Sequence, residues 1–186
     1  DDLTVAVAVN GVLQSGKTST TSAGTWSIPN VTAFSGDVIT VFFSGVSDSA
    51  EGVAITKYDG TFDITGMNLY ERHLSLGSND NPTLSNTDIG LYDNSVSSNE
   101  DIFHDVVGLD LTVCALSGCT DSELIIGTTT TFRPDSGGSG SVITHDIEID
   151  GFVTADGNTF EVSGSWDNNG GFDDGTSLVI FNATST

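Results

Sequence analysis

The side chains of this sequence that could do chemistry are mostly carboxylates. The 186 residues include 26 Asp and Glu, 4 Lys and Arg, and 3 His. Asp is much the commoner acid, and it stands beside Asn and Gly in turn-like runs. Short carboxylates on tight turns suit Ca²⁺, a hard ion that binds about six to eight oxygens. The alternative interpretation is that Asp and Asn favour turns because their side chains hydrogen-bond the local backbone.

Two clusters of oxygen-bearing side chains are the leading candidates for a calcium site. Their members are Asp167, Asn169, Asp173 and Asp174 in the first cluster, and Asn79, Asp80 and Asn81 in the second. Neither cluster satisfies the EF-hand pattern, since Gly171 replaces the third oxygen ligand in the first. Ca²⁺ is therefore the predicted cofactor, with adaptation to high salt as the competing explanation of the acid excess.

Local signatures of common active sites are missing from the sequence. It contains no Gly-x-Ser-x-Gly elbow, no His-Glu-x-x-His, no P-loop and no Gly-x-Gly-x-x-Gly. His73, His104 and His145 stand in strand-like or acid-flanked contexts that favour a structural role. Two carboxylates could flank a sugar in a glycosidase, but so acid-rich a chain always offers some suitable pair. We expect no catalytic residues and no enzyme activity.

Aromatic side chains could bind a glycan without chemistry, by offering flat faces to sugar rings. The candidates are Trp26, Trp166, Tyr58, Tyr70 and Tyr92. Core packing is the competing interpretation for both Trp residues, because they stand in strand-like patterns.

The charge balance excludes two classes of partner. The formal net charge is −22, whereas binding a nucleic-acid backbone requires clustered cations. An anionic membrane surface would repel the chain for the same reason. No apolar run approaches the roughly 18 residues of a membrane helix. No leader-like segment opens the sequence, so we expect a signal peptide to be absent or already removed.

Cys114 and Cys119 enclose a short Ala-Leu-Ser-Gly segment between apolar runs. This spacing lets the flanks turn back and meet, so we expect a disulfide that closes a short loop. A zinc or redox pair would need Cys-x-x-Cys spacing or nearby His partners, and this pair has neither. Disulfides persist in oxidising compartments, which predicts a secreted or cell-surface protein.

Short β-type runs separated by Gly, Asn, Asp and Ser predict an all-β fold. Residues 3–9 alternate large and small side chains and stop at Asn10-Gly11, a strong hairpin signal. Further strands are predicted at 24–28, 37–43, 53–58 and 67–76. Their spacing indicates an immunoglobulin-like β region over residues 1–76. Residues 77–186 form a second predicted β region, and the two could also be one continuous β domain.

An internal repeat marks the C-terminal third of the chain. Residues 147–157 align with residues 160–170 at an offset of thirteen, with apolar, Glu, apolar and then Gly in register. Such strands would bury Ile147 and Phe160 either in a sheet meander or in the rungs of a β-solenoid. Solenoids need about three or more rungs, and two with a partial third are recognised. A β-sandwich or jelly-roll is therefore the first choice, with a β-solenoid-like C-terminal third as the alternative.

The run from Gly164 to Asn182 resembles a Gly-Ser-Trp-x-Asn-Asn-Gly-x-Phe pattern of very large, repetitive secreted surface proteins and adhesin-like proteins of bacteria. Residues 24–28, 36–41 and 99–106 resemble the same uncharacterised group. The resemblance covers about half the chain and implies an exported, repetitive β architecture with a structural or adhesive role. It supplies no catalytic residues. Gly171 and Asp173-Asp174 depart from the pattern, so a calcium role there would be specific to this sequence.

Together these features predict a structural subunit or repeat of an extracellular surface filament, sheath or layer. Its predicted partners are copies of itself or neighbouring repeats. The N-terminal strand could be donated to the open edge of the next subunit. The side chains that would fill the acceptor groove are Leu3, Val5, Val7 and Val9. The alternative is an adhesin or carbohydrate-binding module that grips a glycan through its loops.

Overall fold

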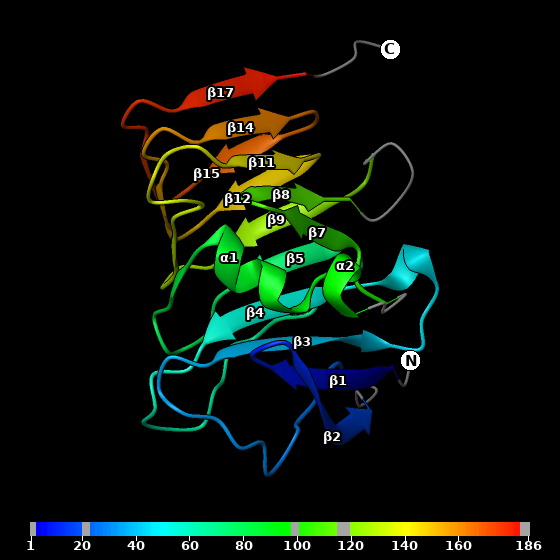
Figure 1. Cartoon of the computed structure of the whole chain (residues 1–186). Coiled ribbons are helices and arrows are strands. Elements are labelled where there is room, and N and C mark those ends of the chain that lie inside the picture. Colours follow the sequence, from blue (N-terminus) through cyan, green and yellow to red (C-terminus); the bar gives the residue numbers. More distant parts are fainter. Residues whose placement is uncertain (1–2, 20–22, 98–100, 115–119, 183–186) are drawn as a thin grey trace.

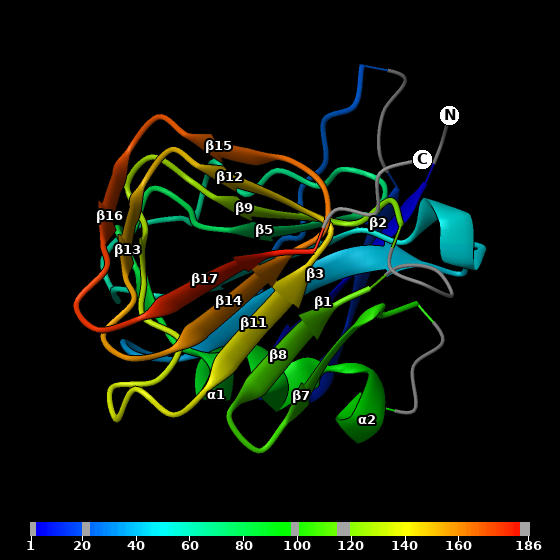
Figure 2. The same cartoon turned by 90° about the horizontal axis from the view of Figure 1, so that it is seen from above.

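Stacked rungs of β-strand organise this chain, which returns repeatedly to the same three faces. The computed structural model describes residues 3–19, 23–97, 101–114 and 120–182. Three mainly parallel sheets form the faces, and each circuit of the chain passes from one face to the next (Figure 2). The protein is all-β, as predicted, and its arrangement is β-solenoid-like.

Four rungs can be followed in the described residues. The first contains β5 (His73–Leu76), β6 (Thr83–Leu84) and β8 (Asp110–Val113), and the second contains β9 (Glu123–Ile126), β10 (Thr131–Phe132) and β11 (Ser141–Thr144). The third contains β12 (Asp146–Ile149), β13 (Phe152–Thr154) and β14 (Thr159–Val162), and the fourth contains β15 (Trp166–Asn168), β16 (Gly171–Asp173) and β17 (Leu178–Phe181). Figure 1 shows the stack from the side, with β17 at the top.

Columns of apolar side chains form the core, because each strand alternates inward and outward residues with period two. On the first face Leu74, Leu124 and Ile147 follow one another in register, and all three are 0% exposed. The other two faces supply the equivalent columns Leu84–Phe132–Val153 and Leu111–Val142–Phe160. Burying one such side chain is worth about 1.5–3 kcal/mol, so the shared interior holds the three faces together.

The last two rungs repeat at an offset of 19 residues on every face. The paired positions are Ile147 with Trp166, Phe152 with Gly171, and Thr159 with Leu178. The predicted offset of thirteen is wrong as a stacking register, because it matches β12 to β14. These strands lie on different faces of one rung and share only the inward alternation. The solenoid-like arrangement therefore extends well beyond the C-terminal third, from β5 to β17.

Glycine at one corner lets successive rungs approach closely. The N–H groups of Gly151 and Gly170 donate to the carbonyl oxygens of Ile126 and Ile149, at 3.0 and 2.8 Å. A Cβ added to Gly170 would collide with the carbonyl oxygen of Gly151. Gly151 and Gly170, which are 19 residues apart, thus mark a corner where the backbone of one rung packs on the backbone of the next.

The amino-terminal strands extend the first sheet. They are β1 (Thr4–Val9), β2 (Val12–Ser19), β3 (Val38–Ser44) and β4 (Val53–Lys57), and the sheet runs β2-β1-β3-β4-β5-β9-β12-β15. β1 to β4 pair antiparallel, whereas β4 pairs parallel with β5. The immunoglobulin-like sandwich expected for residues 1–76 is not confirmed, because β1 to β5 all lie in one sheet that continues into the rungs.

Strand β1 is buried on both faces and paired on both edges. Ala6 and Ala8 belong to the interior core. An outer apolar cluster takes its other side chains, Val5, Val7 and Val9, with Leu3 packed against them. The predicted hairpin at Asn10-Gly11 is confirmed, with φ values of 47° and 78°. Donation of β1 to another subunit finds no support here, because β2 and β3 of its own chain already flank it.

Short helices lie beside the amino-terminal end of the rung stack (Figure 1). They are α1 (Asn86–Ile89), the 3-10 turn η2 (Gly90–Tyr92) and α2 (Asn94–Ser97), next to β7 (His104–Val107), which pairs antiparallel with β8. A further 3-10 turn, η1 (Asp48–Ala50), connects β3 to β4. In the described ranges, none of the helices has the length and apolar character needed to cross a membrane.

Candidate functional sites: the fourth rung and the groove

The fourth rung is the outermost strand layer of all three sheets. β15, β16 and β17 each stand last in their sheet, and no other described element pairs with their outer edges (Figure 1). In a parallel ladder, alternate backbone groups point to opposite sides of the strand. Because the Asn169 N–H donates to the Ile149 carbonyl oxygen at 2.9 Å, the alternation directs the Asn168 N–H to the outer edge.

An aromatic cluster covers the core at this end. The ring centroids lie 5.1 Å apart in Trp166 and Phe172, 5.6 Å apart in Phe160 and Phe172, and 6.0 Å apart in Trp166 and Phe181. All three pairs meet edge to face. Trp166 therefore packs on the core, as the competing interpretation held. Phe181 is still 61% exposed, so the rung ends in an apolar surface.

The outer edges of the fourth rung carry little of the chemistry that usually protects sheet edges. Lys, Pro and bulges discourage pairing with another chain, and residues 166–181 contain no Lys, Arg or Pro. Their charged residues are Asp167, Asp173 and Asp174. Strand β17 is wholly apolar, and its Leu178 is 56% exposed.

Strand β2 forms the opposite edge of the first sheet. Its outer side is unpaired by any described strand, and Val12 and Leu13 are 63% and 47% exposed. At the β7 edge of the third sheet, by contrast, the Val106 N–H donates to the Asp93 carboxylate at 3.0 Å, so this edge group already has a partner. The first sheet thus presents an unpaired strand at each end of the rung stack.

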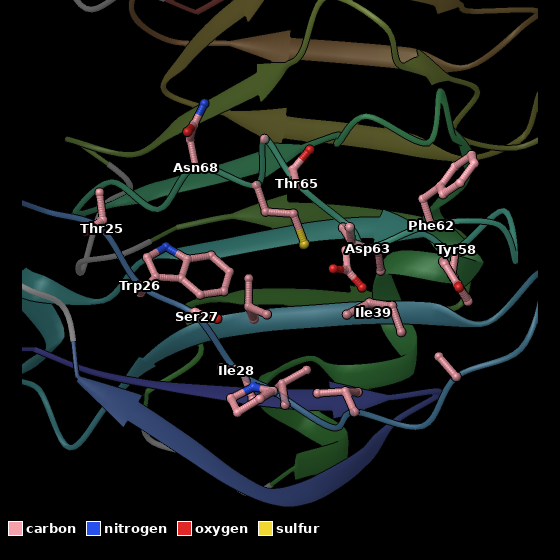
Figure 3. Close-up of a pocket in the computed structure, with 18 of the residues that line it drawn as sticks. Thr25, Trp26, Ser27, Ile28, Ile39, Tyr58, Phe62, Asp63, Thr65 and Asn68 are labelled. Atoms are coloured by element: carbon pink, nitrogen blue, oxygen red, sulfur yellow. The ribbon is translucent and has the colours of Figure 1, made fainter.

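A groove crosses the outer face of β1 and β3, between residues 24–33 and residues 58–68 (Figure 3). Its volume is about 740 Å³. Buried Val7, Ile39 and Val41 lie beneath it. Residues 24–28, predicted to form a strand, are irregular and supply one wall with Trp26. The other wall brings Tyr58, so the groove unites two of the aromatic residues proposed for glycan binding.

Sequence reasoning missed two further groove residues, Phe62 and Asp63. Phe62 is 79% exposed, and Asp63 reaches toward the space between Trp26 and Tyr58 (Figure 3). Their signal is an aromatic residue within the turn-rich run Asp59-Gly-Thr-Phe-Asp63, where a core role is not expected. Among the described residues that line the groove, Asp63 is the single charged one.

The remaining aromatic candidates lie elsewhere. Tyr70 is 49% exposed and meets His73 edge-on at 5.6 Å between ring centroids, outside the groove. Tyr92 is 5% exposed and packs on Phe42 at 5.5 Å. Tyr92 is therefore a core residue rather than a glycan platform.

The first predicted calcium cluster lies on β15, β16 and the turns that follow them. Asp167, Asn169, Asp173 and Asp174 are all exposed. Within the described ranges, no group of three or more His, Cys, Asp or Glu side chains could hold a metal ion. Asn169 instead donates to Asp150 of the rung below at 3.2 Å. Calcium binding stays a prediction without an assembled site.

The second predicted cluster anchors one wall of the groove. The Thr65 N–H donates to Asn79 Oδ1 at 2.6 Å, and the Asn79 N–H donates to the Thr65 carbonyl oxygen at 2.9 Å. Asp80 is buried, which raises the pKa of its carboxyl, and it accepts the Asp59 N–H at 3.1 Å. Asn81 takes a positive φ of 48° in the adjoining turn. Local backbone bonding, the alternative interpretation, accounts for these contacts.

Each histidine has its own local environment. His73 Nε2 lies 2.7 Å from Glu123 Oε2, and His145 Nδ1 lies 2.8 Å from Asp146 Oδ2. His104 is 0% exposed, and burial lowers its pKa to about 4. A neutral His104 packs edge-on against Phe103.

The predicted disulfide lies partly outside the described residues. Cys114 follows β8, but Cys119 falls in the range 115–119, of which the structure describes nothing. The Cys114–Cys119 pairing therefore stays a prediction. No protein-family model, curated protein or solved structure matches this chain, so its function is argued from its own geometry.

Proposed function

We propose that this chain is a structural module of an extracellular surface assembly, in which the fourth rung of one copy pairs with the β2 edge of the next. The observation that carries the proposal is the unpaired outer edge of the fourth rung above an exposed aromatic cluster. The secreted location rests on the predicted disulfide and the acidic composition.

Unpaired strand edges favour this function because they are templates for further pairing. A row of free N–H and C=O groups readily accepts another strand. Here β15, β16 and β17 present such rows on three sides of one apolar surface. Covering Trp166, Phe172 and Phe181 would add about 25 cal/mol for every Å² of apolar surface removed from water.

Strand β2 is the favoured partner because it ends the same sheet at the other end. Pairing β15 with β2 of the next copy would continue the first sheet through both molecules. Such a head-to-tail contact is heterologous, and repeated contacts of this kind build filaments. The β2 segment contains Lys17 and no acid, whereas β15 contains Asp167.

An edge-blocking proline tests the assembly. Asn168→Pro removes an N–H that points away from β12, so the rung below keeps its ladder. We expect wild-type protein to form oligomers that grow with concentration in analytical ultracentrifugation, and Asn168→Pro to remain monomeric with an unchanged circular dichroism spectrum. Asn168→Ala is the matched control and should assemble like the wild type.

Mixing the two proteins tests the head-to-tail arrangement. The blocked variant still offers β2, so it can join the β15 end of a growing chain and stop further growth. Small amounts should therefore shorten wild-type oligomers in electron micrographs. A wild-type chain that is monomeric at all concentrations would refute self-assembly. Closed dimers that ignore the variant would refute the β15–β2 contact.

A further inference from the structure

We propose that the groove over β1 and β3 is a binding site for an uncharged oligosaccharide. The inference is separate from the assembly proposal, because the described residues that line the groove include none of β2 and none of the fourth rung. The aromatic residues, the polar residues and the charge of the groove together favour this one class of ligand.

Aromatic side chains stand on opposite walls of the groove, and aromatic rings can stack on the faces of sugar rings. Trp26 rises from one wall and Tyr58 and Phe62 from the other (Figure 3). Ring faces offer large, rigid contact area, and Tyr and Trp add a polar handle. Phe62 is 79% exposed, and an exposed aromatic ring at the edge of a groove is more readily explained by a ligand than by the core.

Polar side chains along the same groove supply hydrogen bonds to hydroxyl groups. Asp63 offers two acceptor oxygens, and the amide of Asn68 offers both donors and acceptors. The wall that carries them is fixed by the paired contacts between Thr65 and Asn79. A volume of about 740 Å³ lies within the usual range of ligand sites, about 300–1,000 Å³.

The charge of the groove selects a neutral ligand. The molecule has a net charge of −22, and no Lys, Arg or His is among the described residues that line the groove. Uronate, sulfate or phosphate groups would therefore enter without a cation to pair with. A basic peptide is disfavoured because only one of the protein's 26 acidic residues, Asp63, is among the described residues that line the groove, so several cations would find a single partner there.

Calorimetric titration of the full chain tests the site. The probes are neutral gluco-, xylo- and N-acetylglucosamine oligomers, an oligogalacturonate as the anionic counterpart, and a Lys-rich peptide. We expect at least one neutral oligomer to bind and the oligogalacturonate not to bind. Phe62→Ala and Trp26→Ala should each weaken that binding by about tenfold.

Tyr70→Ala is the matched control, because Tyr70 is exposed but lies outside the groove. It should bind like the wild type. Phe62→Ala removes an exposed ring, so it reports on the ligand even if Trp26→Ala impairs folding. The proposal is overturned if no neutral oligomer binds, if binding survives Phe62→Ala unchanged, or if the Lys-rich peptide binds more tightly than every sugar. None of these outcomes bears on the Asn168→Pro assembly test.

Discussion

Burial determines the pKa of Glu51, and no pattern in the sequence indicates that this residue is buried. Its side chain is 4% exposed between η1 and β4, and burial, with the nearby charges of Asp48 and Asp101, raises its pKa to about 7. Asp101 is held there by the N–H groups of Gly45 and Val46, at 3.0 and 3.2 Å. The acids that did attract attention, such as Asp167, are exposed. The composition gives the number of carboxylates, but only the tertiary fold determines which of them are desolvated.

Glu51 makes stability depend on pH in a predictable direction. Since the folded pKa lies above the unfolded value of 4.5, the folded state keeps a proton that the unfolded chain releases, and this group lowers stability as pH rises from about 4.5 to about 7. Glu51→Gln should raise the free energy of unfolding in urea, by on the order of 1–2 kcal/mol more at pH 8 than at pH 5.5. Glu71→Gln, at an exposed position, should show no such difference. An equal gain at both pH values would contradict the burial of an ionisable Glu51.

Individual strands were the most predictable elements, because alternation and turn chemistry are local. The sequence predicts β1, its Asn10-Gly11 turn, and most of β3 and β4. The predicted stacking register is wrong, because strands on all three faces of a rung share the same alternation of inward and outward side chains. It also predicted a strand at residues 24–28, where Trp26 packs as part of an irregular wall. The groove could not be predicted, because its two walls are separate in sequence and are brought together only by packing on the same face of β1 and β3.

Strand β1 should contribute to stability rather than to assembly. Val7 is 1% exposed within the outer apolar cluster, so Val7→Asp would bury a carboxylate without a partner. We expect a loss of about 3 kcal/mol or more in the free energy of unfolding. Val107→Asp is the control for charge, because Val107 is 68% exposed on β7 and lies outside both the β2 edge and the fourth rung. If Val7→Asp were as stable as the wild type and failed only to assemble, strand donation would be restored as the mechanism.

At the scale of the whole molecule, charge opposes the proposed association. Two copies with net charges of −22 repel one another over a distance set by the ionic strength, about 10 Å at 0.1 M salt and about 3 Å at 1 M. An apolar contact with unpaired strand edges would have to overcome this repulsion. The excess of acidic residues therefore opposes self-association, whereas the unpaired edges and apolar surface of the fourth rung favour it. Salt screens the repulsion and so shifts the balance toward association.

Self-association should accordingly strengthen with ionic strength. We expect the weight-average mass in sedimentation equilibrium to rise as sodium chloride increases from about 0.05 M to about 1 M, because screening weakens the repulsion between copies. Asn168→Pro should stay monomeric throughout the series. Oligomers that instead dissociate as salt is added would contradict this expectation and indicate a contact held mainly by ion pairs instead of by the burial of apolar surface.

The first and last strands along the chain, β1 and β17, lie toward opposite ends of the molecule (Figure 1), and this arrangement has a mechanical consequence. Tension applied between these strands acts across successive ladders of hydrogen bonds, so the bonds of one rung carry the load before those of the next. The rungs would then peel away one after another at modest force, each releasing a short length of chain. A module of this kind yields gradually under load and dissipates energy as it lengthens.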